Sequence, residues 1–292
     1  MERSPCHLRR WLLLALALLC AGENLRAAGR TRTPGDVPAW SGKFSATGET
    51  VAVSPLGENL WVTVIPSGKS VESMELFRGA RSEKAEWSAF DPVSRVWIGR
   101  LKSAPETGGR DWAKREICEV GTSLRHATCE GNLLGWINQT GGKVLPFAVM
   151  KVGFSTKCPP PGTPLVDGDG RVMGLYFQDG SLPNQGYALP AAAVWRVKQD
   201  LLVTGKLRKA WLGLSLNPEN GIPRVTRVEE GSPAEKAGLK AGDLLLSVDE
   251  RSLTDYADAA NAFFYLIPGS PVKIGFQRGS QEWKVKMVPE ER

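Results

Sequence analysis

The most reactive side chains beyond residue 30 are one imidazole, His126, and three thiols, Cys118, Cys129 and Cys158. A Cys–His pair can carry out acyl transfer, and a structural zinc site takes four ligands at characteristic spacing. Cys129 lies only three residues after His126, and Cys118, His126 and Cys129 would supply three ligands with unsuitable gaps. We therefore expect His126 to be a loop residue without a catalytic role, and we expect no metal and no cofactor.

The first residues of the chain have the pattern of an export signal. Three arginines precede an apolar run over residues 11–19, and small residues follow it. This pattern predicts a signal peptide over residues 1–28, cleaved within 21–28, and a periplasmic or secreted mature protein without a membrane span. An uncleaved anchor is disfavoured because a bilayer span needs about 20 residues. Lipid attachment at Cys20 is the less favoured alternative, because the preceding residue, Leu19, is large.

Export would place the remaining thiols under oxidising conditions, where a disulfide can form. Cys118 and Cys129 are close in the sequence and could tie a hairpin together. We therefore predict a Cys118–Cys129 disulfide, with Cys158 as a free thiol. Connectivity cannot be deduced from the sequence alone, so the other pairings stay open.

The overall composition is that of a globular protein. Of 292 residues, 42% are hydrophobic and 23% are charged, which excludes disordered, collagen-like and heptad-repeat chains. The net charge of +6 is spread along the chain without a block of Lys and Arg, so nucleic acid is not an expected partner. The 32 glycines and 20 prolines favour many turns and short strands.

The mature chain divides into a leader and two units. Residues 29–43 are polar and predict a flexible leader. Residues 44–207 hold many short alternating apolar runs, which predict a β-sandwich or barrel, followed by a helix over residues 191–203. Residues 208–292 predict five further strands, with one short helix and a longer one over residues 254–266. The predicted fold class is mostly β.

The second unit contains three short glycine-containing motifs. Residues 230–243 read EGSPAEKAGLKAGD, residues 211–214 read WLGL and residues 268–274 read PGSPVKI, a combination typical of PDZ domains in bacterial proteases. The resemblance implies a groove that takes a peptide C-terminus as an added strand. The residues that it implies are Leu212, Gly213 and Leu214 in the carboxylate-binding loop, and Ala259 and Phe263 on the longer helix.

Three segments of the first unit carry further motifs. Residues 186–190 read GYALP and lead through a helix into the PDZ-like unit. Residues 162–174 read GTPLVDGDGRVMG, and residues 91–101 read DPVSRVWIGRL. With these segments the mature chain as a whole resembles the HtrA (DegP-like) family, in which a trypsin-like double β-barrel precedes an α+β PDZ domain. The last two segments are similar to that family's motifs near the catalytic serine and the catalytic aspartate.

The triad residues of the family do not carry over to this chain. The serine position falls on Pro161, the aspartate position on Arg95 and the histidine position on Pro66. A serine protease needs a hydroxyl, an imidazole base and a carboxylate that orients the base. The proline run 159–161 also lacks backbone N–H groups, which removes donors on which an oxyanion hole would depend.

Three functions are compatible with these patterns. The first is an exported pseudoprotease, without catalytic activity, that binds peptide or protein C-termini through its PDZ groove. The second is an active serine endopeptidase or other hydrolase with an unconventional site, against which the proline run argues. The third is a structural assembly subunit, over which the retained PDZ signature favours the first. The resemblance also allows a homo-oligomer.

Overall fold

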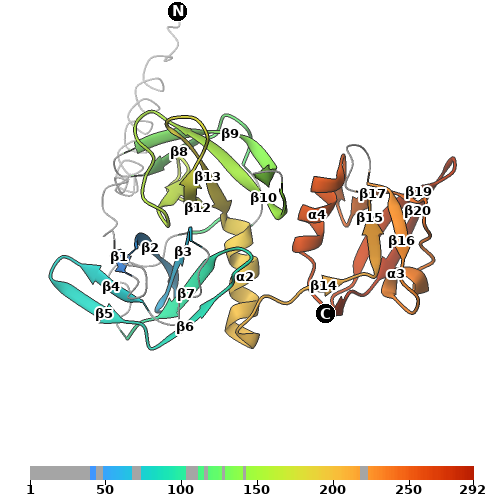
Figure 1. The fold of residues 1–292 in the computed structure, drawn as a ribbon, viewed down its shortest axis with the longest axis horizontal. Coiled ribbons are helices and arrows are strands. Elements are labelled where there is room, and N and C mark those ends of the chain that lie inside the picture. Colours follow the sequence, from blue (N-terminus) through green and yellow to red (C-terminus); the bar gives the residue numbers. More distant parts are fainter. Residues whose placement is uncertain are drawn as a thin grey trace, which may run out of the picture. The chain divides into compact units, whose positions relative to one another are not determined.

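The computed structural model describes residues 40–43, 49–67, 74–102, 111–114, 118–126, 129–140, 143–217 and 223–292. The predicted signal peptide and most of the predicted leader lie outside these residues. In the part of the chain that is described, none of the helices is both long enough and apolar enough to cross a membrane. The described residues form a mostly β protein, as predicted (Figure 1).

The first sheet contains seven strands in the order β5-β4-β1-β2-β3-β7-β6, and it is open in the described residues. Short alternating runs pair antiparallel between neighbours, with a tight turn joining β2 to β3 at residues of positive φ, Glu58 and Asn59. The strands are β1 (Trp40–Lys43), β2 (Thr50–Gly57), β3 (Leu60–Val64), β4 (Glu75–Arg78), β5 (Arg81–Lys84), β6 (Trp87–Phe90) and β7 (Val96–Arg100).

Strand β1 lies inside the segment that was predicted to be a flexible leader. Trp40 pairs with Val53 in the sheet, and its ring centroid lies 5.5 Å from that of Trp61. The Trp40 side chain is only 8% exposed. Burial of a large indole is strongly favourable, so residues 40–43 belong to the sheet and the predicted end of the leader at residue 43 is wrong.

The second sheet closes into a barrel in the order β10-β13-β12-β11-β8-β9. Apolar side chains that alternate along the strands fill its interior, among them the fully buried Leu133, Val152 and Leu175. The strands are β8 (Ser123–His126), β9 (Cys129–Thr140), β10 (Lys143–Phe154), β11 (Pro164–Val166), β12 (Val172–Asp179) and β13 (Gln185–Pro190).

Helix α2 (Ala191–Thr204) follows the barrel and confirms the helix predicted over residues 191–203. Pro190 precedes it in an extended conformation. Gly205 ends it with φ of 72°, and its N–H donates to the carbonyl of Leu201 at 3.1 Å. A left-handed glycine after the last turn is the usual way to satisfy the end of a helix.

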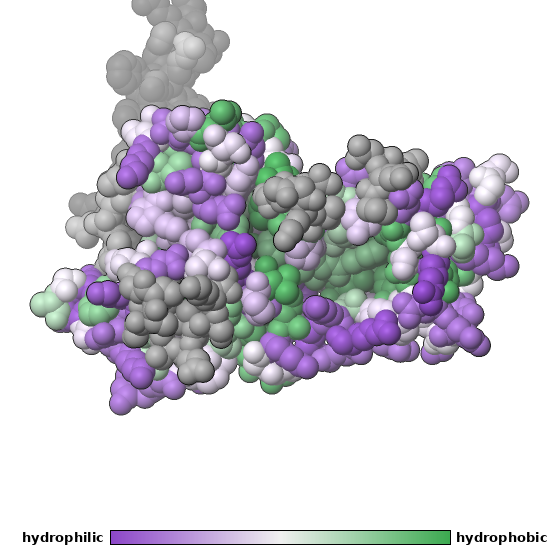
Figure 2. Space-filling model, viewed as in Figure 1, coloured by the Kyte–Doolittle hydropathy of each residue, from purple (hydrophilic) through white to green (hydrophobic). Residues whose placement is uncertain are grey.

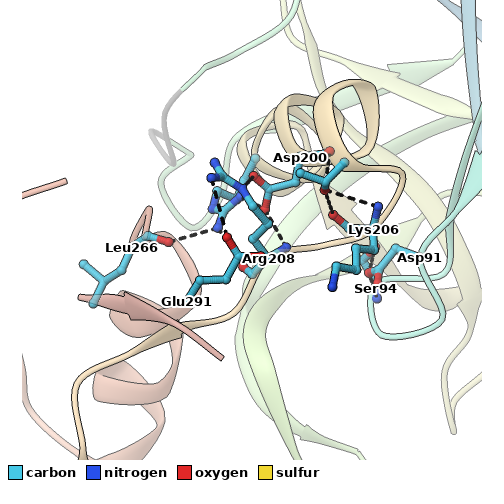
Figure 3. A network of polar contacts seen from close by, with 9 residues as sticks. Asp91, Ser94, Asp200, Lys206, Arg208, Leu266 and Glu291 are labelled. Atoms are coloured by element: carbon cyan, nitrogen blue, oxygen red, sulfur yellow. Dashed lines mark hydrogen bonds and ion pairs between the residues drawn. The ribbon is translucent and has the colours of Figure 1, made fainter. Parts of the chain in front are cut away.

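A buried ion-pair network lies along the last turns of α2 (Figure 3). The carboxylate of Asp200 pairs with Arg196 and accepts from Arg208 Nε at 3.0 Å and from the Arg208 backbone N–H at 2.8 Å. Asp200 is 1% exposed and Arg196 5%. Arg196 Nη2 also donates to the carbonyl of Leu266 at 2.9 Å, which connects α2 to the C-terminal unit.

The C-terminal unit packs two helices against short antiparallel strands around its own core. Helix α3 (Pro233–Lys236) begins after Ser232, whose hydroxyl accepts from the Glu235 N–H at 3.1 Å. Helix α4 (Tyr256–Phe264) is the longer one. The strands are β14 (Ala210–Trp211), β15 (Leu214–Leu216), β16 (Val225–Val228), β17 (Leu244–Val248), β18 (Arg251–Ser252), β19 (Val272–Arg278), β20 (Gln281–Met287) and β21 (Glu290–Glu291).

Candidate functional site

A cavity of about 580 Å³ lies where two of the three predicted triad positions meet. Pro66, in the turn after β3, and Pro161, in the loop before β11, both line it. The remaining lining residues are Glu49, Lys157, Cys158, Pro159, Pro160, Tyr176, Phe177, Gln178 and Asp179. The wall is therefore rich in proline and aromatic side chains.

Arg95, the third predicted triad position, is anchored to two residues that line this cavity. Its Nη1 donates to the carbonyl of Pro66 at 2.6 Å, and its guanidinium lies 5.0 Å from the centroid of the Phe177 ring. The Arg95 backbone has φ of 60°, directly after a turn in which the Asp91 carboxylate accepts from the N–H and hydroxyl of Ser94. The fold thus brings the three positions together.

Backbone donors are scarce along the loop from Pro159 to Thr163. Its three prolines have no N–H. The Gly162 N–H donates to the carbonyl of Tyr176 at 2.8 Å, and the Thr163 N–H donates to the carbonyl of Pro160 at 3.2 Å. An oxyanion hole needs N–H groups that are free to point at the developing charge. Both N–H groups of this loop are instead committed within the chain.

The acid–base groups of the cavity do not form a nucleophile–base pair of the Ser–His type. The Tyr176 hydroxyl donates a short hydrogen bond to Asp179. Burial, together with this hydrogen bond, raises the pKa of Tyr176 far above its ordinary value, so the phenol stays protonated at neutral pH. Neither serine nor histidine is among the described residues that line the cavity, and His126 pairs with Cys129 between β8 and β9.

The predicted Cys118–Cys129 disulfide is not formed in the structure, where Cys118, Cys129 and Cys158 are free thiols. The carbonyl of Cys118 accepts from Trp136 Nε1 at 3.1 Å, which places Cys118 beside the middle of β9, whereas Cys129 begins that strand. Closeness in the sequence does not bring these two thiols together, because strand β8 lies between them in the chain and runs along β9.

The loop between β14 and β15 has the geometry expected of a carboxylate-binding loop. Gly213 has φ of 75°, and a Cβ at this position would lie 2.1 Å from the Cβ of Ser232. The carbonyl of Leu212 accepts from Ala234, and that of Gly213 from Glu229. Within the described part of the chain, no backbone acceptor takes the N–H of Leu212 or of Gly213. Free N–H groups of this kind can hold a peptide carboxylate.

The resemblance to PDZ domains implies a peptide groove between β15 and α4. Leu214 and Leu216 on β15 and Phe263 on α4 are all partly buried against the same core. Figure 2 shows hydrophobic surface in the region where Figure 1 draws these two elements. Leu214 pairs with Val228 on β16, so the opposite edge of β15 is the one that would receive an added strand.

One predicted groove residue is placed elsewhere by the structure. Ala259 is fully buried in the core of the unit, so in this structure its side chain offers no exposed surface to a peptide. Ala260 and Tyr256 are both partly exposed and lie three and seven positions before Phe263. Residues at this spacing share one face of a helix, and their partial exposure, unlike the burial of Ala259, makes these two the better candidates.

Comparisons with known proteins find relatives of parts of this chain. The model of the family described as PDZ domain matches residues 210–287. A Bartonella henselae protein named "Probable periplasmic serine endoprotease DegP-like" is 30% identical over 142 residues, which are 43% of this chain and 28% of the relative. The Bacillus subtilis "Serine protease Do-like HtrA" is 24% identical over 149 residues, 43% of this chain and 33% of the relative. Over part of its length the chain is therefore similar to DegP-like and HtrA serine proteases, and residues 210–287 match a PDZ domain.

Solved structures share the fold of this chain over most of its length. The HtrA-type protease AlgW with a tripeptide aligns with a TM-score of 0.64 at 16% identity, covering 87% of this chain and 94% of that one. The serine endoprotease from Yersinia pestis aligns with a TM-score of 0.56 at 17% identity, with the same coverage of 87% and 94%. The trypsin-like fold predicted for the first unit is thereby confirmed, whereas the curated relatives match over only about a third of their own length or less.

Proposed function

We propose that this HtrA-like chain is an exported pseudoprotease that binds the C-termini of peptides or proteins in its PDZ groove and does not cleave them. The observation that carries the proposal is the loop from Pro159 to Thr163. Three of its residues have no N–H, and the other two N–H groups are bonded to carbonyls of the chain. A tetrahedral intermediate formed here would lack the donors that stabilise its oxyanion.

The charge at the site supports the same conclusion. A trypsin-like mechanism stabilises an imidazolium with a carboxylate. The resemblance assigns that carboxylate's position to Arg95, whose guanidinium contacts the Pro66 carbonyl and the Phe177 ring. The groove supports the binding part of the proposal, since the loop at Gly213 keeps its left-handed backbone and its free N–H groups. Export is supported by the periplasmic naming of the relatives.

Restoring triad residues should not restore proteolysis. We expect no labelling by a fluorophosphonate and no cleavage of unfolded casein for the wild type, for Pro161→Ser, or for the triple variant Pro66→His, Arg95→Asp, Pro161→Ser. The triple variant regains the three side chains and the N–H of residue 161, but Pro159 and Pro160 still have no N–H. The second oxyanion donor is therefore still missing, and one such donor is worth roughly 2.7–4 kcal/mol. Casein cleavage is measured by gel electrophoresis beside trypsin as a positive control.

Two further variants test the alternative function, a hydrolase in which a cysteine thiol acts as the nucleophile in place of the serine. Cys158 is the thiol that lines the cavity, and His126 is the imidazole of the described residues. If the purified wild type cleaves casein and either Cys158→Ser or His126→Ala abolishes that cleavage, the chain is a hydrolase and the proposal is wrong.

A further inference from the structure

Cys129 stands at the tip of the β8–β9 hairpin, next to the end of β10. It pairs with His126 across the hairpin and is buried, with 6% of its surface exposed. Further along β9, Gly131 pairs with Phe154, and the Ser155 N–H donates to the carbonyl of Glu130 at 2.8 Å. One more step in this antiparallel register places Cys129 opposite the segment that follows Ser155, which is the segment that carries Cys158.

Cys158 also lies near the end of β10, on the side of β13. Its Sγ lies 3.5 Å from the carbonyl of Gln185, and Gln185 pairs with Gly153 near the end of β10. Cys158 packs against the apolar cluster that contains Cys129. Burial, with a smaller contribution from the neighbouring Cys158 thiol, raises the pKa of Cys129. The register and the electrostatic influence both place Cys158 beside Cys129.

Cys118 is excluded as the partner of Cys129 by the same ladder. The Leu133 N–H donates to the carbonyl of Thr122 at 2.9 Å, so this pair lies four residues from the pair that contains Cys129. Four residues of strand span about 13 Å, and Cys118 lies further along, beside Trp136. A disulfide requires Cα atoms no more than about 7 Å apart.

We propose that Cys129 and Cys158 form a disulfide in the exported protein and that Cys118 remains a free thiol. The two thiols lose two protons and two electrons as one S–S bond forms. The electrons reduce a disulfide oxidant, such as a thiol–disulfide oxidoreductase or oxidised glutathione, to two thiols. This inference rests on the export part of the proposed function and is independent of the absence of proteolysis.

The bond would fix the proline loop at its beginning. Cys158 directly precedes Pro159, and the far end of the proline run is already held, because the Ala52 N–H donates to the carbonyl of Pro161 at 2.7 Å. Cys158 also supplies the thiol that lines the cavity. The disulfide therefore attaches this loop to the β8–β9 hairpin and removes the thiol nucleophile from the cavity wall.

Tryptic mapping separates the three cysteines, because each lies in its own peptide: residues 116–125, 126–143 and 158–171. The full chain is isolated from the exported fraction with its free thiols alkylated, and it is digested without reduction. We expect peptides 126–143 and 158–171 to be linked and peptide 116–125 to be alkylated. The linked species should persist in Cys118→Ser and be lost in Cys158→Ser.

A second arm tests the bridge apart from export. Purified, reduced protein is incubated with oxidised glutathione and mapped in the same way, and peptides 126–143 and 158–171 should again be linked. A bridge that includes peptide 116–125, or full alkylation of all three peptides in both arms, overturns the inference. Casein cleavage is not measured here, so failure of the bridge and failure of the pseudoprotease proposal are distinguishable.

Discussion

Asp200→Asn should lower the free energy of unfolding by about 3–5 kcal/mol, the usual cost of breaking a buried ion pair on one side. Asp200 is 1% exposed and holds two arginines, and Arg196 is itself 5% exposed. The substitution conserves volume but leaves the Arg196 guanidinium buried without its counter-charge. The measurement is the midpoint of thermal or denaturant unfolding, followed by circular dichroism.

Glu86→Gln is the matched control for this experiment. Glu86 pairs with Lys102 at 3.6 Å, but the two side chains are 48% and 79% exposed. An ion pair in solvent contributes only about 0–1 kcal/mol, so this variant should unfold almost like the wild type. Equal losses for Asp200→Asn and Glu86→Gln would mean that the network in Figure 3 does not stabilise the protein.

Gly213→Val should weaken the binding of a C-terminal peptide by about 10- to 100-fold, which corresponds to roughly 1–3 kcal/mol of strain. Gly213 has φ of 75°, and a Cβ would lie 2.1 Å from Ser232 Cβ, a backbone-anchored atom at the start of α3. The loop must therefore move, and its N–H groups move with it. Affinity is measured by fluorescence anisotropy with a labelled peptide.

The same substitution at Gly269 separates loop geometry from backbone strain. Gly269 has φ of 82°, but a Cβ there meets nothing within 4 Å, and its N–H donates to the carbonyl of Pro289. Gly269→Val should lose some stability and keep the wild-type affinity. Equal loss of affinity in both variants would show that global destabilisation, and not the loop at Gly213, controls binding.

The PDZ unit was predictable because its signals are local. The segment from Ser232 to Asp243 predicts a helix cap, a short helix and a turn in consecutive residues, and the structure contains these three features in that order. The motif was also enough to predict Gly213 as a residue of the carboxylate-binding loop. The motif does not show why a larger residue is excluded there, because a Cβ would clash with Ser232, and only the fold brings Ser232 beside Gly213.

Other features depend on tertiary packing and could not be predicted. Arg196 and Asp200 are spaced like an ordinary solvated helix pair, and their burial follows from how α2 packs and from Arg208. Strand β1 contains one large apolar residue, Trp40, among polar neighbours, and its packing against Trp61 is visible only in the fold. The commitment of the Gly162 N–H to Tyr176 depends on which strand borders the loop, and nothing in the loop's own sequence specifies it.

Binding without cleavage is tested most directly by one titration followed by analysis of the same sample. A labelled peptide with an apolar residue and a free carboxylate at its C-terminus is titrated with the full chain, and the peptide is then recovered after overnight incubation and weighed by mass spectrometry. We predict a Kd near micromolar, about −8 kcal/mol, at least tenfold weaker binding of the amidated peptide, and recovery of the intact peptide. Recovery of cleaved peptide, or equal affinity for the amidated form, would contradict the account.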